Sequence, residues 1–285
     1  MIEAYYHASK QHWLPVRDRG WTIQRFPEIN QAYPSFARFA SASIQDLLVK
    51  GQLKLASLEA SFFRSVILLN RGDHFELRAL PNEAQFAPVF GIAVADFDLS
   101  GTHDLVIHQN FHSTSSISGR QDAGGLLFLR GDGTGRFTPV APLTSGLNHP
   151  GQGRSVATCD FNHDGRPDFV STLHAGQSRL YQNQSPRTGI RITLQGPPNN
   201  LAAVGASARI VYPGPKYGPR MEVSLGSGYS SQHASTLILG AKTSPIAVEI
   251  RWPSGQTVQY PIDSRQTFRQ TFSENLNRKL RQDEP

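Results

Sequence analysis

The chain has 285 residues, of which 38% are hydrophobic and 18% charged, and this composition is typical of a globular protein with room for two modest domains. Its 25 Gly and 19 Pro residues predict many turns, which favours an all-β fold, and the net charge of +6 indicates solubility rather than a nucleic-acid surface. The single cysteine excludes an internal disulfide, and no run approaches the roughly 18 apolar residues of a membrane span.

Residues 1–52 form an N-terminal segment in which one helix is expected. Met1 to about Asn30 has no clear hydrophobic period, so loop or mixed structure is predicted there. From about residue 34 to residue 50, apolar residues recur near helical spacing, and Pro34 suits a first helical turn. The first twenty residues lack the apolar core of a signal peptide, so no export signal is predicted in this chain.

Residues 53–186 contain a repeated pattern of short strands. A hairpin with a Gly-Asp turn is followed by two apolar runs that flank an acidic loop, and the same order then recurs. Asp96 and Asp160 are 64 residues apart, and Phe75 and Phe137 are 62 apart. A near-constant period that holds four strands is typical of a propeller blade. A third unit is expected to begin at residues 178–184.

The acidic loop of the second unit predicts a calcium site. Asp160, Asn162 and Asp164 alternate, so their oxygens can point to one side, and Gly165 permits the chain to turn around an ion. Asp168 can complete the set of ligands. The flanks are strands, and no Glu stands at the twelfth position, so the loop is not an EF-hand.

The first unit carries an earlier copy of this loop. Asp96, Asp98 and Asp104 keep their carboxylates, whereas Ser100 replaces a stronger ligand, so calcium is expected to bind more weakly here than at Asp160. The alternative for both loops is a plain hairpin turn held by Asx hydrogen bonds. Two copies at matched positions favour the metal.

Other candidate residues favour packing over chemistry. His103, His108 and His112 could form a transition-metal site, but surface or packing roles are favoured, because His103 lies inside the acidic loop and the other two lie on or after a strand. Trp252 could stack on a sugar ring, yet a Trp at a strand end more often belongs to a core. The sequence contains neither a G-x-S-x-G elbow nor an H-E-x-x-H motif.

Residues 190–262 predict a separate, compact antiparallel domain. Six short strand candidates are separated by turns rich in Gly, Pro and Ser, at residues 191–196, 206–212, 220–226, 235–240, 247–252 and 257–262. Residues 263–285 follow as a polar tail rich in Arg, in which a frayed helix is expected.

Two parts of the chain resemble a known family. The acidic units, each with an upstream Gly-Asp turn, resemble FG-GAP/VCBS repeats of integrin-type propellers. Residues 190–262 resemble the ASPIC/UnbV domain that follows such repeats, on the strings Val204-Gly205-Ala206, Gly226 to Gln232, and Trp252-Pro253-Ser254-Gly255. The family includes cartilage acidic protein and its bacterial counterparts.

The resemblance implies a mainly β fold: a partial β-propeller of FG-GAP/VCBS blades and a small antiparallel β domain, with one N-terminal helix. It implies a calcium-stabilised, non-catalytic module located outside the cell or in the periplasm. The metal positions that it implies are Asp96, Asp98, Ser100, Asp104, Asp160, Asn162, Asp164 and Asp168.

Two functional hypotheses follow from the sequence. The first is an interaction module for a protein or glycan, without nucleic acid; since a closed propeller has six or seven blades, N-terminal blades or a partner would complete it. The second is an enzyme or biosynthetic accessory protein that acts on a polysaccharide or natural product, because propellers also host hydrolases and lyases. An acid–base pair in a cleft away from the acidic loops would favour the second hypothesis.

Overall fold

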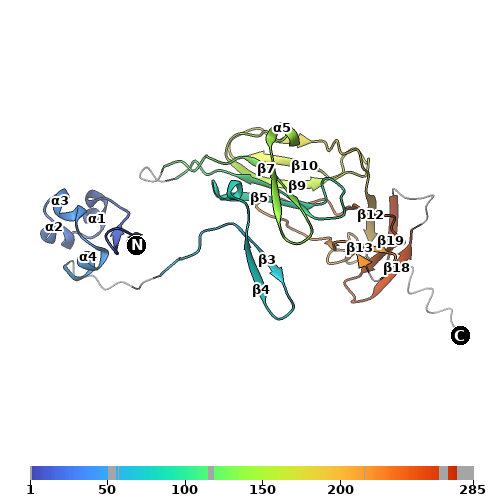
Figure 1. Cartoon of the computed structure of the whole chain (residues 1–285), viewed down its shortest axis with the longest axis horizontal. Coiled ribbons are helices and arrows are strands. Elements are labelled where there is room, and N and C mark those ends of the chain that lie inside the picture. Colours follow the sequence, from blue (N-terminus) through green and yellow to red (C-terminus); the bar gives the residue numbers. More distant parts are fainter. Residues whose placement is uncertain are drawn as a thin grey trace. The chain divides into compact units, whose positions relative to one another are not determined.

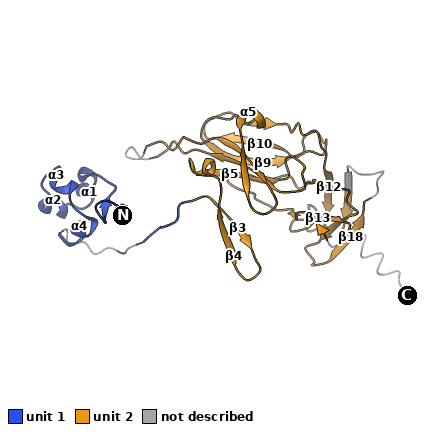
Figure 2. Ribbon diagram, in the orientation of Figure 1, with its two compact units in different colours: residues 1–63 blue, residues 64–285 orange. Residues whose placement is uncertain are grey.

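The computed structural model describes residues 2–50, 56, 58–114, 119–214, 216–262 and 269–274. The chain divides into two compact units, residues 1–63 and residues 64–285 (Figures 1 and 2). The sequence placed the end of the first domain at residue 52, whereas the contacts place it after Phe63. No helix among the described residues has the length and apolar character that a membrane span requires.

The first unit is a short hairpin followed by four short helices. The hairpin pairs β1 (Ala4–His7) with β2 (His12–Pro15), and the helices are α1 (Arg19–Arg25), α2 (Glu28–Ala32), α3 (Phe36–Ala40) and α4 (Ile44–Lys50). Their apolar faces meet in one small core of Ile29, Tyr33, Phe39, Ala42 and Leu47. The unit therefore has a core of its own.

The prediction of one N-terminal helix over residues 34–50 is wrong. The segment is split into α3 and α4, because Ser43 and Asp46 form a reciprocal capping box that starts a new helix. The region before residue 30 also holds α1, which begins where the Asp18 side chain accepts the backbone N–H of Trp21. The capping residues mark where these short helices begin, which hydrophobic period alone does not show.

The second unit begins with small antiparallel sheets, none of which is closed. A two-stranded hairpin, a four-stranded sheet in the order β5-β6-β7-β8 and a three-stranded sheet in the order β9-β10-β11 follow one another along the chain. The 3₁₀ helix η1 (Asn82–Gln85) and α5 (Pro142–Ser145) lie in the connections. The strands are β3 (Val66–Asn70), β4 (Phe75–Ala79), β5 (Val89–Ala95), β6 (Asp104–Gln109), β7 (Leu126–Gly131), β8 (Phe137–Val140), β9 (Gly153–Cys159), β10 (Asp168–Leu173) and β11 (Arg179–Tyr181).

Every strand predicted in this region is present, but the strands are grouped into sheets differently from the predicted repeat units. The hairpin β7-β8 joins the preceding strands β5 and β6, instead of opening a unit with β9 and β10. Likewise β11 pairs with β10, so residues 179–181 complete the second sheet and do not begin a third unit. A constant period fixes the length of a repeat and leaves its starting point open.

The two larger sheets pack through β5 and β9. Gly91 of β5 approaches β9 so closely that an added Cβ would lie 2.9 Å from the carbonyl carbon of Ser155. Between the sheets, Phe97 packs against Phe128 and Phe169. His108 of β6 is fully buried and hydrogen-bonds Ser171 of β10 at 2.7 Å. A polar contact thus joins the sheets within their apolar interface.

The rest of the second unit is a β domain of two sheets, in which all six predicted strands are found. One sheet has the order β16-β12-β19; the other has the order β14-β13-β17-β18, with β15 also paired to β13. A buried core that includes Trp252 lies among these strands. The strands are β12 (Ile190–Gln195), β13 (Ser207–Tyr212), β14 (Lys216–Tyr217), β15 (Met221–Glu222), β16 (Leu237–Leu239), β17 (Ala247–Arg251), β18 (Thr257–Pro261) and β19 (Arg269–Ser273).

Strand β19 lies inside the predicted polar tail. Where a frayed helix was expected, Arg269–Ser273 pairs in parallel with β12. Phe272 packs on Tyr260, with 4.4 Å between the ring centroids. Residues 263–268 and 275–285 of the tail lie outside the described residues.

Candidate metal centre

The two acidic loops have the same backbone conformation. The first connects β5 to β6 and the second connects β9 to β10. Leu99 and Gly101 in the first loop have positive φ angles of 54° and 82°, and their equivalents His163 and Gly165 have 60° and 76°. Since side chains other than Gly rarely adopt this region, the shared geometry shows that the loops are copies of one turn.

Hydrogen bonds from the backbone hold the first and last aspartates of each loop. Asp96 accepts the N–H groups of Ser100 and Gly101, and Asp160 accepts the equivalent two of Asp164 and Gly165. At the far end, Asp104 accepts from Phe97 and Gly131, and Asp168 accepts from Phe161 and Asn183. The first loop is therefore linked to β7 through Gly131, and the second loop is linked through Asn183 to the segment after β11.

The first loop gathers three carboxylates. Asp96, Asp98 and Asp104 each offer an oxygen that lies within 4.8 Å of the others, and no other group of three metal-ligating His, Cys, Asp or Glu residues is found among the described residues. Burial raises the pKa of Asp96 to about 7, against the hydrogen bonds from Gly101 and Ser100. Burial likewise raises the pKa of Asp104 to about 6. A group of oxygens with so much unbalanced negative charge could hold a metal ion.

Two neighbours complete the first loop. Arg130 of β7 pairs with Asp98, with 3.0 Å between Nε and Oδ2, and 54% of the Arg130 side chain is exposed. The Ser100 hydroxyl lies 2.8 Å from the hydroxyl of Thr102, which in turn donates to the carbonyl of Gly131. Ser100, the fourth predicted ligand of this loop, is thus near the carboxylates but is engaged with Thr102.

The second loop is balanced by arginines. Arg191 of β12 places its Nε 3.0 Å from Oδ2 of Asp160, and these side chains are 17% and 1% exposed. Arg166 pairs with Asp164 at 2.9 Å, and the Asn162 amide donates to the same carboxylate. Burial raises the pKa of Asp168. The four predicted ligands are neighbours, but their carboxylates do not form a group like that of the first loop.

Comparison with protein families matches two segments of the second unit, and the Asp96 loop lies before the first of them. Residues 116–171 match the model of an FG-GAP-like repeat, and residues 196–273 match the model named ASPIC and UnbV. The chain combines an FG-GAP-like repeat with an ASPIC/UnbV domain. The matched repeat contains the Asp160 loop, and the matched domain extends through β19. No curated protein matches the chain.

Both acidic loops lie against the ASPIC/UnbV domain or the segment that leads into it. Gly240, directly after β16, is so close to Asp96 that an added Cβ would collide with the carboxylate. At the second loop, the backbone N–H of Gly189 donates to the carbonyl of Gly165 at 2.9 Å, beside the Arg191 pair. Sequence reasoning missed Arg191 and Gly240, because each lies far from its loop in the chain and in no recognisable motif.

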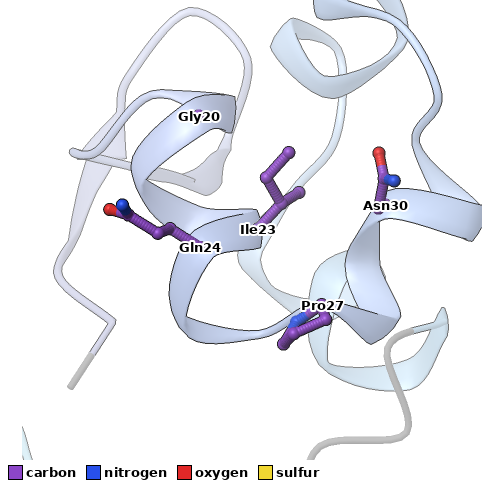
Figure 3. A pocket seen from close by; sticks show the side chains of 5 residues that line it. All are labelled: Gly20, Ile23, Gln24, Pro27 and Asn30. Carbon is purple, nitrogen blue, oxygen red and sulfur yellow. The ribbon is translucent and has the colours of Figure 1, made fainter.

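Two cavities contain no acid–base pair. In the first unit, an open hollow between α1 and α2 is lined by Gly20, Ile23, Gln24, Pro27 and Asn30, none of which is charged (Figure 3). In the second unit, a cleft between the two larger sheets is lined by aromatic and amide side chains, including Phe97, Phe169 and Asn183. Tyr181 is the single titratable residue in its wall. Neither cavity has a carboxylate or imidazole in its wall.

Proposed function

We propose that this chain is a non-catalytic interaction module whose FG-GAP-like sheets are consecutive blades of an incomplete propeller stabilised by calcium. The single observation that supports the metal site is that carboxylate oxygens of Asp96, Asp98 and Asp104 lie within 4.8 Å of one another. Calcium takes six to eight oxygen ligands at such loops, whereas zinc and copper favour nitrogen and sulfur. The family matches and the exposed apolar side chains of β5 support the interaction role.

In the proposed centre, the three carboxylates hold the ion and the backbone keeps them in place. Their hydrogen bonds to Ser100, Gly101 and Gly131 orient the oxygens, and these contacts connect β5, β6 and β7. The bound ion supplies the positive charge that the buried carboxylates need. Since the assembled centre exists only in the folded chain, metal affinity adds to the free energy of unfolding.

Exposed apolar residues along β5 support a contact surface for a protein or glycan. Ile92 and Val94 of this edge strand are 46% and 43% exposed, although their neighbours on the other face are buried. Tyr229 of the ASPIC/UnbV domain extends the surface, since its ring lies edge-on to Phe90 with 5.8 Å between centroids. Exposed apolar side chains of this kind are typical of surfaces that a partner covers.

The alternative function is an enzyme or biosynthetic accessory protein that acts on a polysaccharide or natural product. It would need an acid–base pair in a cleft. The two cavities described above provide none, and His108, the imidazole whose pKa is lowered to about 4, is fully buried. These observations favour the interaction module.

The calcium proposal is tested by thermal melting of the full chain in calcium and in chelator. At calcium concentrations about 100-fold above Kd, binding adds about 2.7 kcal/mol to the free energy of unfolding, which raises Tm by about 5 to 10 °C. Asp98→Asn removes one ligand charge and should weaken affinity about 10-fold or more. Asp73→Asn is the control, because Asp73 is an 86% exposed turn residue outside the loops. A natural chain that melts identically in calcium and chelator would contradict the proposal.

A further inference from the structure

Arg191 forms the most enclosed ion pair at either acidic loop. It belongs to β12, the first strand after the FG-GAP-like sheets, and its Nε lies 3.0 Å from Oδ2 of Asp160. The Asp160 side chain is 1% exposed and that of Arg191 is 17% exposed. Because a buried carboxylate is costly without a cation, this arginine supplies charge that Asp160 requires.

No arginine among the described residues pairs with Asp96, the equivalent carboxylate of the first loop. Asp96 accepts backbone N–H groups from Ser100 and Gly101 and lies against Gly240. Arg130 pairs with Asp98 at the surface, where solvent screens the pair and an incoming ion can displace it at little cost. Two further cations contact the loop elsewhere: Arg187 donates to the carbonyl of Leu99 at 3.4 Å, and Lys242 lies beside Gly101. The position of Asp98 is filled in the second loop by the uncharged Asn162, and Arg166 further neutralises Asp164.

We infer that Arg191 serves as the built-in cation of the second loop, so that the first loop binds calcium and the second does not. The inference rests on the proposed calcium centre and reverses the order of affinity that the sequence predicts. A divalent ion bound to Asp160 would lie beside the guanidinium, and repulsion between the two is strong at a buried position. Calcium and Arg191 therefore exclude each other.

The same contact attaches the ASPIC/UnbV domain to the repeat. Arg191 and the hydrogen bond from Gly189 to Gly165 both join the start of that domain to the second loop. The backbone framework of the loop is kept, although its charge is balanced from the neighbouring domain. One copy of the repeated loop is thus a metal centre, and the other is a docking contact.

The experiment counts calcium ions bound per full-length chain by equilibrium dialysis, for the natural chain and for Arg191→Gln. We expect one ion for the natural chain and two for the variant. In chelator the variant should melt about 6 to 12 °C lower, and calcium should restore part of this loss. Arg209→Gln is the matched control, because Arg209 also pairs with a buried carboxylate, Glu249, at 2.7 Å, but away from both loops. It should lose stability and still bind one ion.

A second variant covers the case in which Arg191→Gln does not fold. Asn162 is exposed, so Asn162→Ala should fold, and it should bind one ion with unchanged affinity. Two ions in the natural chain, or one ion in a folded Arg191→Gln chain, would overturn the inference and leave the proposed calcium centre standing. No bound ion in either chain would overturn both.

Discussion

Four aspartates, Asp96, Asp104, Asp160 and Asp168, are at most 7% exposed, and each accepts backbone N–H groups in an equivalent pattern. The hydrogen bonds fix the direction of the carboxylates, and the remaining charge is costly unless a cation balances it or a proton neutralises it. In the second loop Arg191 provides the positive charge. In the first loop we propose that calcium does.

The sequence predicted eight ligand positions in two loops and ranked the Asp160 loop as the tighter site, which is the opposite of the order that we infer from the structure. Alternating Asp and Asn residues around a Gly predict the turn, and the positive φ angles at Gly101 and Gly165 agree with it. The order that we infer depends on Arg191, which is 31 residues from Asp160 and reaches it from β12. A charge contributed by another element has no local pattern in the sequence.

Buried histidines predict a decrease in stability at acidic pH. Burial lowers the pKa of His108 from 6.5 to about 4, and burial also lowers the pKa of His149, which hydrogen-bonds the same Ser171. Between pH 6.5 and pH 4 these histidines bind more protons in the unfolded chain, so their contribution to the free energy of unfolding is highest above pH 6.5 and falls toward pH 4. The contribution of His108 is about 3 kcal/mol at most.

Urea unfolding from pH 7.5 to pH 4.5 in saturating calcium measures this effect. His108→Gln should make the pH dependence shallower, because the variant has no imidazole to protonate in the unfolded state. His74→Gln is the control, since His74 lies in an exposed turn and its side chain is 63% exposed. An unchanged slope for His108→Gln would show that His108 does not carry the pH dependence.

Among the elements, β12 connects the FG-GAP-like sheets to the ASPIC/UnbV domain. It lies between β16, which is antiparallel, and β19, which is parallel, and its Ile192 is fully buried. Short runs rich in apolar residues, bounded by turn residues, predicted β12 and β16. The short strand β19 was missed because Arg269, Gln270 and Thr271 give it polar composition, and only its pairing with β12 makes it a strand.

Loss of β19 should destabilise the ASPIC/UnbV domain. Truncation after Ile262 removes the parallel partner of β12 and the contact between Phe272 and Tyr260. We expect a loss of about 2 kcal/mol or more, seen as a Tm lower by about 4 °C or more. Truncation after Glu274 is the matched control, because it retains β19. Equal melting temperatures for the two truncated chains would show that β19 contributes nothing to stability.

In the molecule as a whole, the two units have separate cores. The first is the helical core of Ile29, Tyr33, Phe39, Ala42 and Leu47, and both acidic loops belong to the second unit. Short apolar runs bounded by turn residues predicted most strands of the second unit, such as β6 and β17, whereas β14 and β19 were missed. The four short helices of the first unit were harder, because helices of five to seven residues offer little periodicity and depend on their caps.

Calcium should therefore stabilise one unit and leave the other unchanged. Scanning calorimetry of the full chain should show two transitions, and calcium should raise the temperature of only the transition that belongs to residues 64–285. Asp98→Asn should reduce that shift without moving the other transition. An equal calcium shift in both transitions would contradict the assignment of the metal to the second unit.

Calorimetric titration of calcium into the folded, full-length chain measures how many ions the two loops bind. We expect a single site per chain, with the carboxylates of Asp96, Asp98 and Asp104 as ligands. A second site would retain the calcium-stabilised repeat but contradict the role of Arg191. The absence of any binding, in a chain shown to be folded, would mean that both acidic loops are turns held by hydrogen bonds alone.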